Sequence, residues 1–290
     1  MAGPGPRLLF ASDLHGATRA YAALFALARQ REACDAVVLG GDLLPHPHDR
    51  ARLVETQAEY AQDVLRPMLA ALATDRPDLP VYAIPGNDDW ATVIAALAGW
   101  SDTTLSLLVG RAVPLACAPG WWIAGCPYVP VTPFFMSDFD RLDHEGWAPA
   151  ALPPALVLTE GGAVQVADIE ALATRPTVAA ELAALAAQSD PARTVYVTHS
   201  PPARTNLDVM RGGIHIGSEA VRAFIEAHRP PLTLHGHIHE SPHLTGAVQE
   251  RLGATVSVNA GASLGGLRAV EARLDLEAGT ATVRPLFEAP

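Results

Sequence analysis

The chain has 290 residues and a formal net charge of −11, from 20 Lys+Arg against 31 Asp+Glu. All 20 cationic residues are arginine, which excludes Schiff-base lysine chemistry and a phosphate-binding P-loop, because both need an amine. The acidic balance argues against a nucleic-acid partner, which would need clustered cations to neutralise its phosphates. The hydrophobic content of 49% is ordinary for a globular protein.

The cysteines and the N-terminal residues are those expected of a cytoplasmic protein. Cys34, Cys117 and Cys126 form an odd set without a CxxC pair, so we expect no disulfide framework. The first residues do not have the pattern of a signal peptide. No apolar run approaches the roughly 18 to 20 residues that span a bilayer, so we expect no membrane partner.

Short β-rich runs alternate with Ala/Leu-rich stretches, a pattern typical of a layered α/β domain. The expected strands are residues 7–11, 36–39, 81–84, 194–197, 232–234 and 255–258. The expected helices are residues 18–31, 50–73, 91–97, 178–188 and 218–228. Pro67 is expected to kink or divide the second helix, because proline removes a backbone donor. Residues 269–286 alternate apolar and polar side chains, as paired antiparallel strands do.

Two segments depart from this alternation of strands and helices. Residues 105–131 are apolar runs separated by Pro and Gly residues. This pattern predicts further strands in a second sheet. Residues 130–154 are Pro-rich and aromatic, and two interpretations stay open: a loop insertion near a functional site, or aromatics that fill a small separate core. We find no internal repeat or clear linker, and we expect a single domain over residues 7–288.

Polar motifs follow five of the expected strands. They are Asp13-Leu14-His15, Gly40-Gly41-Asp42, Gly86-Asn87-Asp88-Asp89, Thr198-His199-Ser200-Pro201-Pro202 and His235-Gly236-His237-Ile238-His239. In an open α/β sheet, ligands bind outside the carboxyl ends of the strands, so all five loops could face one crevice. The glycines before Asp42, Asn87 and His237 are expected to let the backbone turn sharply there.

These motifs supply carboxylate, amide and imidazole groups but no thiolate. Such ligands suit Mn, Fe, Co, Zn or Ni, and the absence of cysteine argues against a thiolate zinc or iron–sulfur site. Seven ligands are too many for one ion with open positions. They fit two ions about 3.5–4 Å apart that share one bridging carboxylate.

The five motifs, in this order over about residues 8–262, resemble those of the calcineurin-like metallophosphoesterases. The resemblance implies a four-layer α/β/β/α sandwich with the metal site at the C-terminal ends of the strands. It implies two groups of ligands: Asp13, His15, Asp42 and His239 for the first metal, and Asp42, Asn87, His199 and His237 for the second, with Asp42 bridging.

The resemblance also implies a dinuclear metal-dependent hydrolase of phosphoester bonds. A metal-bridging hydroxide would be the nucleophile and the ions would neutralise the phosphoryl charge. Two divalent cations would be the cofactors, with manganese the expected activator in vitro, and the partner would be a small phosphorylated substrate. The residues expected to take part in catalysis are Asp42, Asn87, Asp88 and His215.

One position departs from the common family pattern. Asp88 stands where the family has a His that is thought to protonate the leaving group, and an ionised carboxylate beside two cations is a poor acid. We therefore expect a preference for phosphodiesters. His215, flanked by glycines, is a candidate proton donor, and the alternative is an exposed loop histidine. His46 and His48, in the Pro-His-Pro-His run after Asp42, are weaker candidates for this role, and the favoured interpretation is that they are solvated loop residues.

Other residues near the motifs receive supporting roles. His235 is expected to orient a ligand, and Asp89 to orient its loop rather than bind metal. Arg204 and Arg211 could clamp a substrate phosphate or could be plain surface residues.

Alternative functions on the same fold are a phosphomonoesterase, a nucleoside polyphosphate hydrolase, or a non-catalytic binding or scaffold protein. A nuclease fits poorly with an acidic chain that lacks lysine. The sequence leaves the oligomeric state open, including a homo-oligomer.

Overall fold

Two six-stranded mixed sheets form the centre of the protein in a computed structural model, which describes residues 5–30, 32–46, 52–150, 155–159, 162–263 and 266–287. Sheet A has the order β18-β17-β1-β2-β3-β4, in which β1 to β4 are parallel and the other two strands are antiparallel. Its strands are β1 (Arg7–Ala11), β2 (Ala36–Gly40), β3 (Val81–Ile84), β4 (Leu105–Leu107), β17 (Arg268–Asp275) and β18 (Thr280–Phe287).

Sheet B has the order β15-β16-β14-β11-β6-β5, with four parallel central strands and one antiparallel strand at each edge. Its strands are β5 (Arg111–Pro114), β6 (Trp122–Cys126), β11 (Thr194–Thr198), β14 (Leu232–His235), β15 (Gln249–Leu252) and β16 (Thr255–Asn259). The six strands expected from the β-rich runs are therefore present, and the C-terminal pair joins sheet A. The expectation that residues 105–131 supply strands of the second sheet is wrong for β4, which pairs with β3, and for Val129–Pro130, which pairs with Asp140–Arg141.

The helices lie outside the two sheets. They are α1 (Thr18–Arg29), α2 (Leu53–Tyr60), α3 (Arg66–Asp75), α4 (Ala91–Leu97), α5 (Glu170–Ala173), α6 (Val178–Ala186), α7 (Glu219–His228) and α8 (Ser241–Thr245), with a π-helical turn over Ala61–Leu65 and a 3₁₀ turn over Pro191–Arg193. Short strand pairs complete the described elements: β7 (Val129–Pro130) with β8 (Asp140–Arg141), β9 (Leu156–Leu158) with β10 (Gln165–Ala167), and β12 (Val209–Met210) with β13 (Ile214–His215). No helix among the described residues is long and apolar enough to cross a membrane.

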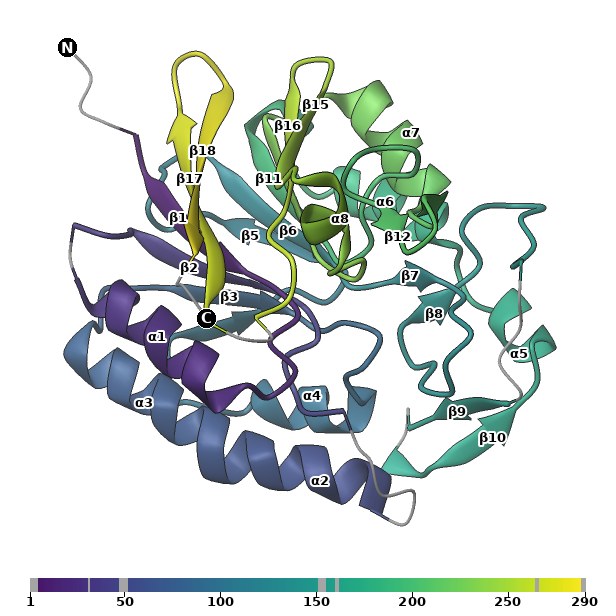
Figure 1. Cartoon of the computed structure of the whole chain (residues 1–290). Helices are drawn as coiled ribbons and strands as arrows, with labels where there is room; N and C mark the ends of the chain where they lie inside the picture. The colour runs from purple at the N-terminus through teal and green to yellow at the C-terminus, as the bar shows by residue number, and fades with distance from the viewer. Residues whose placement is uncertain are drawn as a thin grey trace.

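Successive side chains of sheet A point into two different cores. In β1, Leu8 and Phe10 are buried between the sheets, whereas Leu9 and Ala11 are buried against helices α1 to α4. The outer face of sheet B packs against α6 and α7, where Phe224 joins a third core. Figure 1 shows α1 to α4 on one side of the molecule and α6 and α7 on the other. The predicted four-layer α/β/β/α sandwich is confirmed.

The long helix expected over residues 50–73 is divided just before Pro67. The chain passes from α2 through the π-helical turn, and α3 begins at Arg66. Proline has no N–H to donate to the carbonyl four residues earlier, so the regular α-helical bonding cannot continue through it. Residues 50 and 51 lie outside the described residues.

The aromatic segment over 130–154 divides its side chains between two cores. Phe139 is buried with the helices of sheet A, whereas Trp147 packs against a small separate core. Phe134 is exposed, and Phe135 is partly buried beside Trp90. Residues 151–154 lie outside the described residues, and the single domain over 7–288 stays a prediction.

Tyr21 of α1 connects the helical layer to the loop that follows β2. Its side chain is fully buried, and its hydroxyl donates a hydrogen bond to the Leu43 carbonyl at 2.9 Å. We expect Tyr21→Phe to lower the free energy of unfolding by about 0.5–1.5 kcal/mol, because it removes one buried hydrogen bond while the Leu43 carbonyl keeps the one from the Gly16 N–H at 3.2 Å. Urea denaturation would measure the change. Stability equal to that of the wild type would show that this bond does not hold the loop.

Candidate metal centre

All seven ligands predicted from the sequence lie in one connected cluster, at the C-terminal ends of strands from both sheets. Donor atoms of Asp13, Asp42 and His199 lie within 4.8 Å of one another. His15 Nε2 is 3.6 Å from Asp42 Oδ2, and the His15 ring lies 5.9 Å from that of His239.

The remaining two predicted ligands join the cluster through His199. The rings of His199 and His237 are 5.3 Å apart, and His237 Nδ1 is 2.6 Å from Asn87 Oδ1. Sheet A thus supplies two Asp, one His and one Asn, whereas sheet B supplies three His. The structure therefore brings the predicted ligands of all five loops together.

The backbone at this cluster is strained. Asp13, His15, Asp42 and His237 have φ values of 52°, 43°, 50° and 64°, which side-chain-bearing residues adopt rarely. Among the described non-glycine residues, only Arg204 and Arg229 share this feature. Hydrogen bonds between the loops compensate: Asp13 N donates to the Gly41 carbonyl at 3.0 Å, and His15 N to the Asp42 carbonyl at 2.8 Å. The left-handed residues aim the side chains into the cluster.

Glycine is required before the ligands for two different reasons. Gly41 has φ +107°, so the expected sharp turn explains it. Gly86 and Gly236 lack a positive φ, and there a close approach is the reason. A Cβ on Gly86 would overlap Asp42 Oδ1, and one on Gly236 would overlap Asp13 Oδ2.

The donor set fits divalent cations. Asp13 Oδ2, His15 Nδ1 and His199 Nε2 are buried and lack hydrogen-bond partners. His199 Nδ1 donates to the Gly40 carbonyl at 2.8 Å, which leaves the lone pair of Nε2 directed away from that bond, as in metal-ligating histidines. Buried polar atoms without partners are costly, and coordination would satisfy all three.

Burial and the charged groups of the cluster shift the pKa values of its members. Burial raises the pKa of Asp13. Burial lowers the pKa of His199, but the carboxylates of Asp42 and Asp13 outweigh it and raise that pKa to about 9. Burial beside His199 lowers the pKa of His237 to about 3. Although burial opposes it, His199 holds the pKa of Asp42 well below its usual range. The opposite shifts of Asp42 and His199 show that these two groups stabilise each other's charge inside the cluster.

Asp89 holds two of the ligand-bearing loops together. Its buried carboxylate accepts hydrogen bonds from the backbone N–H groups of Leu43, Leu44 and Gly86, at 3.0, 2.9 and 2.9 Å. The first two belong to the Asp42 loop and the third to the Asn87 loop. The interpretation that Asp89 orients its loop is confirmed by these bonds. Burial and the nearby Asp42 raise the pKa of Asp89 to about 7.

Asp88 lies at the edge of the cluster. Its backbone N–H donates to Asp42 Oδ1 at 2.8 Å, and Asn87 Nδ2 donates to its Oδ1 at 3.1 Å. Asp88 Oδ2 is 3.1 Å from His46 Nδ1 and 3.8 Å from His15 Nδ1. Donor atoms of Asp88, His15 and Asp42 lie within 4.8 Å of one another, so this group could also hold a metal ion, and the part of Asp88 in catalysis stays a prediction.

The interpretation of His46 as a solvated loop residue is wrong. Its side chain is half-buried, bonds to Asp88 and lies with its ring 6.2 Å from that of Phe135. The signal in the sequence was the Pro-His-Pro-His run directly after Asp42. His48 lies outside the described residues.

His215 is not brought to the cluster by any contact of the described residues. Its Nδ1 is 2.7 Å from Asp208 Oδ1, and the buried Asp208 also accepts from the backbone N–H of Thr205 and Gly217. Its role as proton donor stays a prediction.

His235 is buried, 2.8 Å from the hydroxyls of Thr198 and Thr233, and so connects β11 to β14 beside His199.

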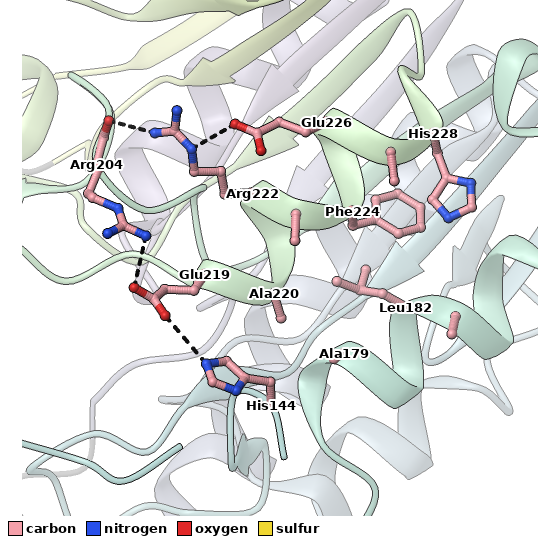
Figure 2. Close-up of a pocket in the computed structure, with 13 residues that line it drawn as sticks. His144, Ala179, Leu182, Arg204, Glu219, Ala220, Arg222, Phe224, Glu226 and His228 are labelled. Atoms are coloured by element: carbon pink, nitrogen blue, oxygen red, sulfur yellow. Dashed lines mark hydrogen bonds and ion pairs between the residues drawn. The ribbon is translucent and has the colours of Figure 1, made fainter. Parts of the chain in front are cut away.

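A pocket of about 550 Å³ lies apart from the predicted ligands, between α6 and α7. Figure 2 shows its polar rim, where Glu219 bonds to both Arg204 and His144. None of the seven predicted ligands lines it.

The pairing of Arg204 with Glu219 at 3.0 Å favours the interpretation of that arginine as a surface residue. Arg211 is exposed in the β12–β13 hairpin.

We expect Asp89→Asn to weaken Mn²⁺ binding about 10- to 100-fold, the usual effect of removing a group that orients ligands. An amide offers one acceptor oxygen where the carboxylate uses two. Calorimetric titration of Mn²⁺ would measure the change. Asp102→Asn, which alters an exposed ion pair with Arg66, is the matched control. Equal affinity in both variants would contradict the proposed role of Asp89.

We expect Gly86→Ala to abolish stoichiometric metal binding, because the added methyl group would displace Asp42 and His199. Gly99→Ala is the control, since a Cβ there meets one carbonyl at 3.6 Å, an ordinary contact. Bound metal per chain, measured by atomic emission, separates the two. Retention of metal by the Gly86 variant would show that the cluster can rearrange.

The chain is similar to known proteins of one family. The model of the family described as calcineurin-like phosphoesterase matches residues 6–241. No match is found among curated proteins. A solved dimetal phosphatase from Danio rerio is 14% identical, covers 98% of this chain and 96% of its own, and has a TM-score of 0.56. At that identity the likeness shows the fold.

Two further solved structures are similar at lower TM-scores. The protein TT1561 of Thermus thermophilus is 17% identical over 97% of this chain and 98% of its own, with a TM-score of 0.48. The phosphopantetheinyl hydrolase of Mycobacterium tuberculosis is 15% identical over 90% and 91%, with a TM-score of 0.47. The family match covers most of the chain, and with this fold and ligand set the protein belongs to the calcineurin-like phosphoesterase family.

Proposed function

We propose that this protein is a dinuclear metal-dependent phosphodiesterase of small phosphorylated substrates. The observation that carries the proposal is the connected cluster of seven ligands, with Asp42 between its two halves and a carboxylate at position 88. Manganese as the activating metal and a cytoplasmic location belong to the same proposal. The family itself supports phosphoester hydrolysis.

The bound cations would supply an activated water and neutralise charge on the phosphoryl group. The protein's part is to hold their ligands in place beforehand. Asp42 Oδ2 lies 3.6 Å from His15 Nε2 and 3.4 Å from His199 Nε2, so this carboxylate joins both predicted ligand sets. The side chain of Asn87 is fixed at both ends, by His237 and by Asp88. Preorganised groups need little rearrangement as charge develops on the substrate.

The preference for diesters is argued from Asp88. Both of its carboxylate oxygens accept hydrogen bonds, so it offers no proton to a departing oxygen. Substrates with stable leaving groups suit such a site. A phosphomonoester is the alternative that an assay must include, because the similar Danio rerio protein is described as a dimetal phosphatase. A nucleoside polyphosphate also has a stable leaving group.

We expect metal-dependent hydrolysis of bis(p-nitrophenyl) phosphate to exceed that of p-nitrophenyl phosphate at equal Mn²⁺ and pH. EDTA should abolish both activities. Asp42→Asn should lower kcat by more than about 10²-fold, beyond the loss typical of groups that only orient ligands, because the carboxylate shared by both predicted ligand sets is removed. Asp102→Asn, at an exposed ion pair, is the control. A higher rate on the monoester would support the phosphomonoesterase, and metal binding without hydrolysis would support the scaffold protein.

A further inference from the structure

Gln57, on helix α2, is a buried polar residue that none of the sequence motifs accounts for. Its side chain is fully buried and bonds to the backbone of two loops. Its Nε2 donates to the Pro45 carbonyl at 3.2 Å and to the Asp88 carbonyl at 2.5 Å, and its Oε1 accepts from the Trp90 N–H at 2.8 Å. These partners fix the orientation of the amide, because a carbonyl needs a donor and an N–H needs an acceptor.

The two loops that Gln57 joins both carry predicted metal ligands. One of its bonds reaches the loop of Asp42, and the other reaches the loop of Asn87. Helix α2 is itself anchored beside them, because the indole N–H of the buried Trp90 donates to the Leu53 carbonyl at 2.8 Å. The amide therefore holds both ligand-bearing loops against one helix.

The position of the Asp88 backbone determines how Asp42 is presented to the other ligands. The Asp88 N–H donates to Asp42 Oδ1 at 2.8 Å, and the carbonyl of the same residue is the one that Gln57 binds. While Oδ1 is held by this N–H, Oδ2 lies 3.6 Å from His15 Nε2 and 3.4 Å from His199 Nε2. Gln57 thus acts on the shared carboxylate through the backbone of one residue.

An apolar side chain would fill the space of Gln57 at a lower cost of burial. A buried amide is unfavourable unless its polar atoms are paired, so this one is stable because of the bonds that it makes. Its three backbone partners lie outside helices and strands, where no regular ladder pairs them. Support of this kind keeps the side chains of a functional site in their geometry.

We propose that Gln57 is a positioning residue of the dinuclear metal centre in the proposed function, on which this inference rests. Its amide holds the Asp88 backbone so that the N–H stays on Asp42 Oδ1. The second oxygen of Asp42 then stays turned toward both predicted ligand sets before any metal ion binds. Without the amide, the Asp88 backbone is free to move, and Asp42 can turn away from one of the two sets.

The test compares two substitutions that remove different parts of the amide. Gln57→Met keeps the length of the side chain and removes every hydrogen bond, whereas Gln57→Glu keeps an acceptor for the Trp90 N–H and has at most one donor. We expect both to weaken Mn²⁺ binding about 10- to 100-fold in calorimetric titration, the usual effect of losing a group that orients ligands. Gln57→Met is expected to have the larger effect, because it also releases Trp90.

Gln188→Met is the matched control. The amide of Gln188 also joins backbone groups, since its Nε2 donates to the Gly110 carbonyl at 3.0 Å and its Oε1 accepts from the Ala112 N–H at 2.9 Å. These groups lie at the β5 edge of sheet B, and we expect this variant to bind Mn²⁺ like the wild type. Equal losses of affinity at positions 57 and 188 would overturn the inference, because metal binding would then follow overall stability.

Amide hydrogen exchange, measured by mass spectrometry before metal is added, distinguishes positioning from a general loss of stability. We expect residues 86–90 to exchange up to about tenfold faster in Gln57→Met, the effect of losing one or two hydrogen bonds, while β2 keeps the protection of the wild type. Unchanged exchange over residues 86–90 would contradict the proposed role. If Gln57→Met does not fold, Gln57→Glu provides both measurements.

The outcomes separate this inference from the proposed function. If the wild type binds Mn²⁺ and both Gln57 variants bind it equally well, Gln57 is not a positioning residue and the phosphodiesterase stands. If the wild type binds Mn²⁺ but cleaves no diester, the phosphodiesterase fails, and a weaker affinity in the Gln57 variants still supports the inference. If the wild type binds no Mn²⁺, the proposed metal centre fails and the inference fails with it.

Discussion

The carboxylate of Asp42 has to serve two predicted groups of ligands, each of which draws residues from both sheets. It lies within 3.6 Å of a histidine from the β1 loop and within 3.4 Å of one from the β11 loop. This is possible because the central strands are parallel within each sheet and the predicted ligands follow their carboxyl ends. The apolar core between the sheets sets the distance across which the ligands meet.

The cluster is held in an unfavourable state by the structure around it. Four of its predicted ligands have left-handed backbone conformations, and three buried donor atoms lack hydrogen-bond partners. Strain of this kind persists only where surrounding contacts determine the geometry. Here those contacts are Asp89, which joins two loops, and Tyr21, which anchors one of them to α1. Because the fold already holds the ligand side chains in this strained geometry, they need little rearrangement when a metal ion binds.

The loops after β2 and β3 are where this protein departs from the common family pattern. Gln57, reaching from α2, connects both loops, and the aromatic segment over 130–154 contributes Phe135 to the same place. Helix α2 and this segment therefore shape the edge of the site as well as filling cores. Substrate selection at that edge would depend on these elements.

The sequence by itself predicted the layered α/β class, and its resemblance to a family implied the sandwich and the predicted ligand set. The uninterrupted apolar run in Arg7–Ala11 marks a strand that is buried on both faces, and the motifs that contain Asp42, Asn87 and His237 follow strands of this kind. Only the tertiary structure decided the contact between His46 and Asp88, and the bond that occupies His215. These are contacts between irregular loops, set by single side chains such as Gln57 and Asp208. No periodicity encodes such contacts, because they depend on where distant segments pack, whereas strand alternation and ligand spacing are properties of the local chain.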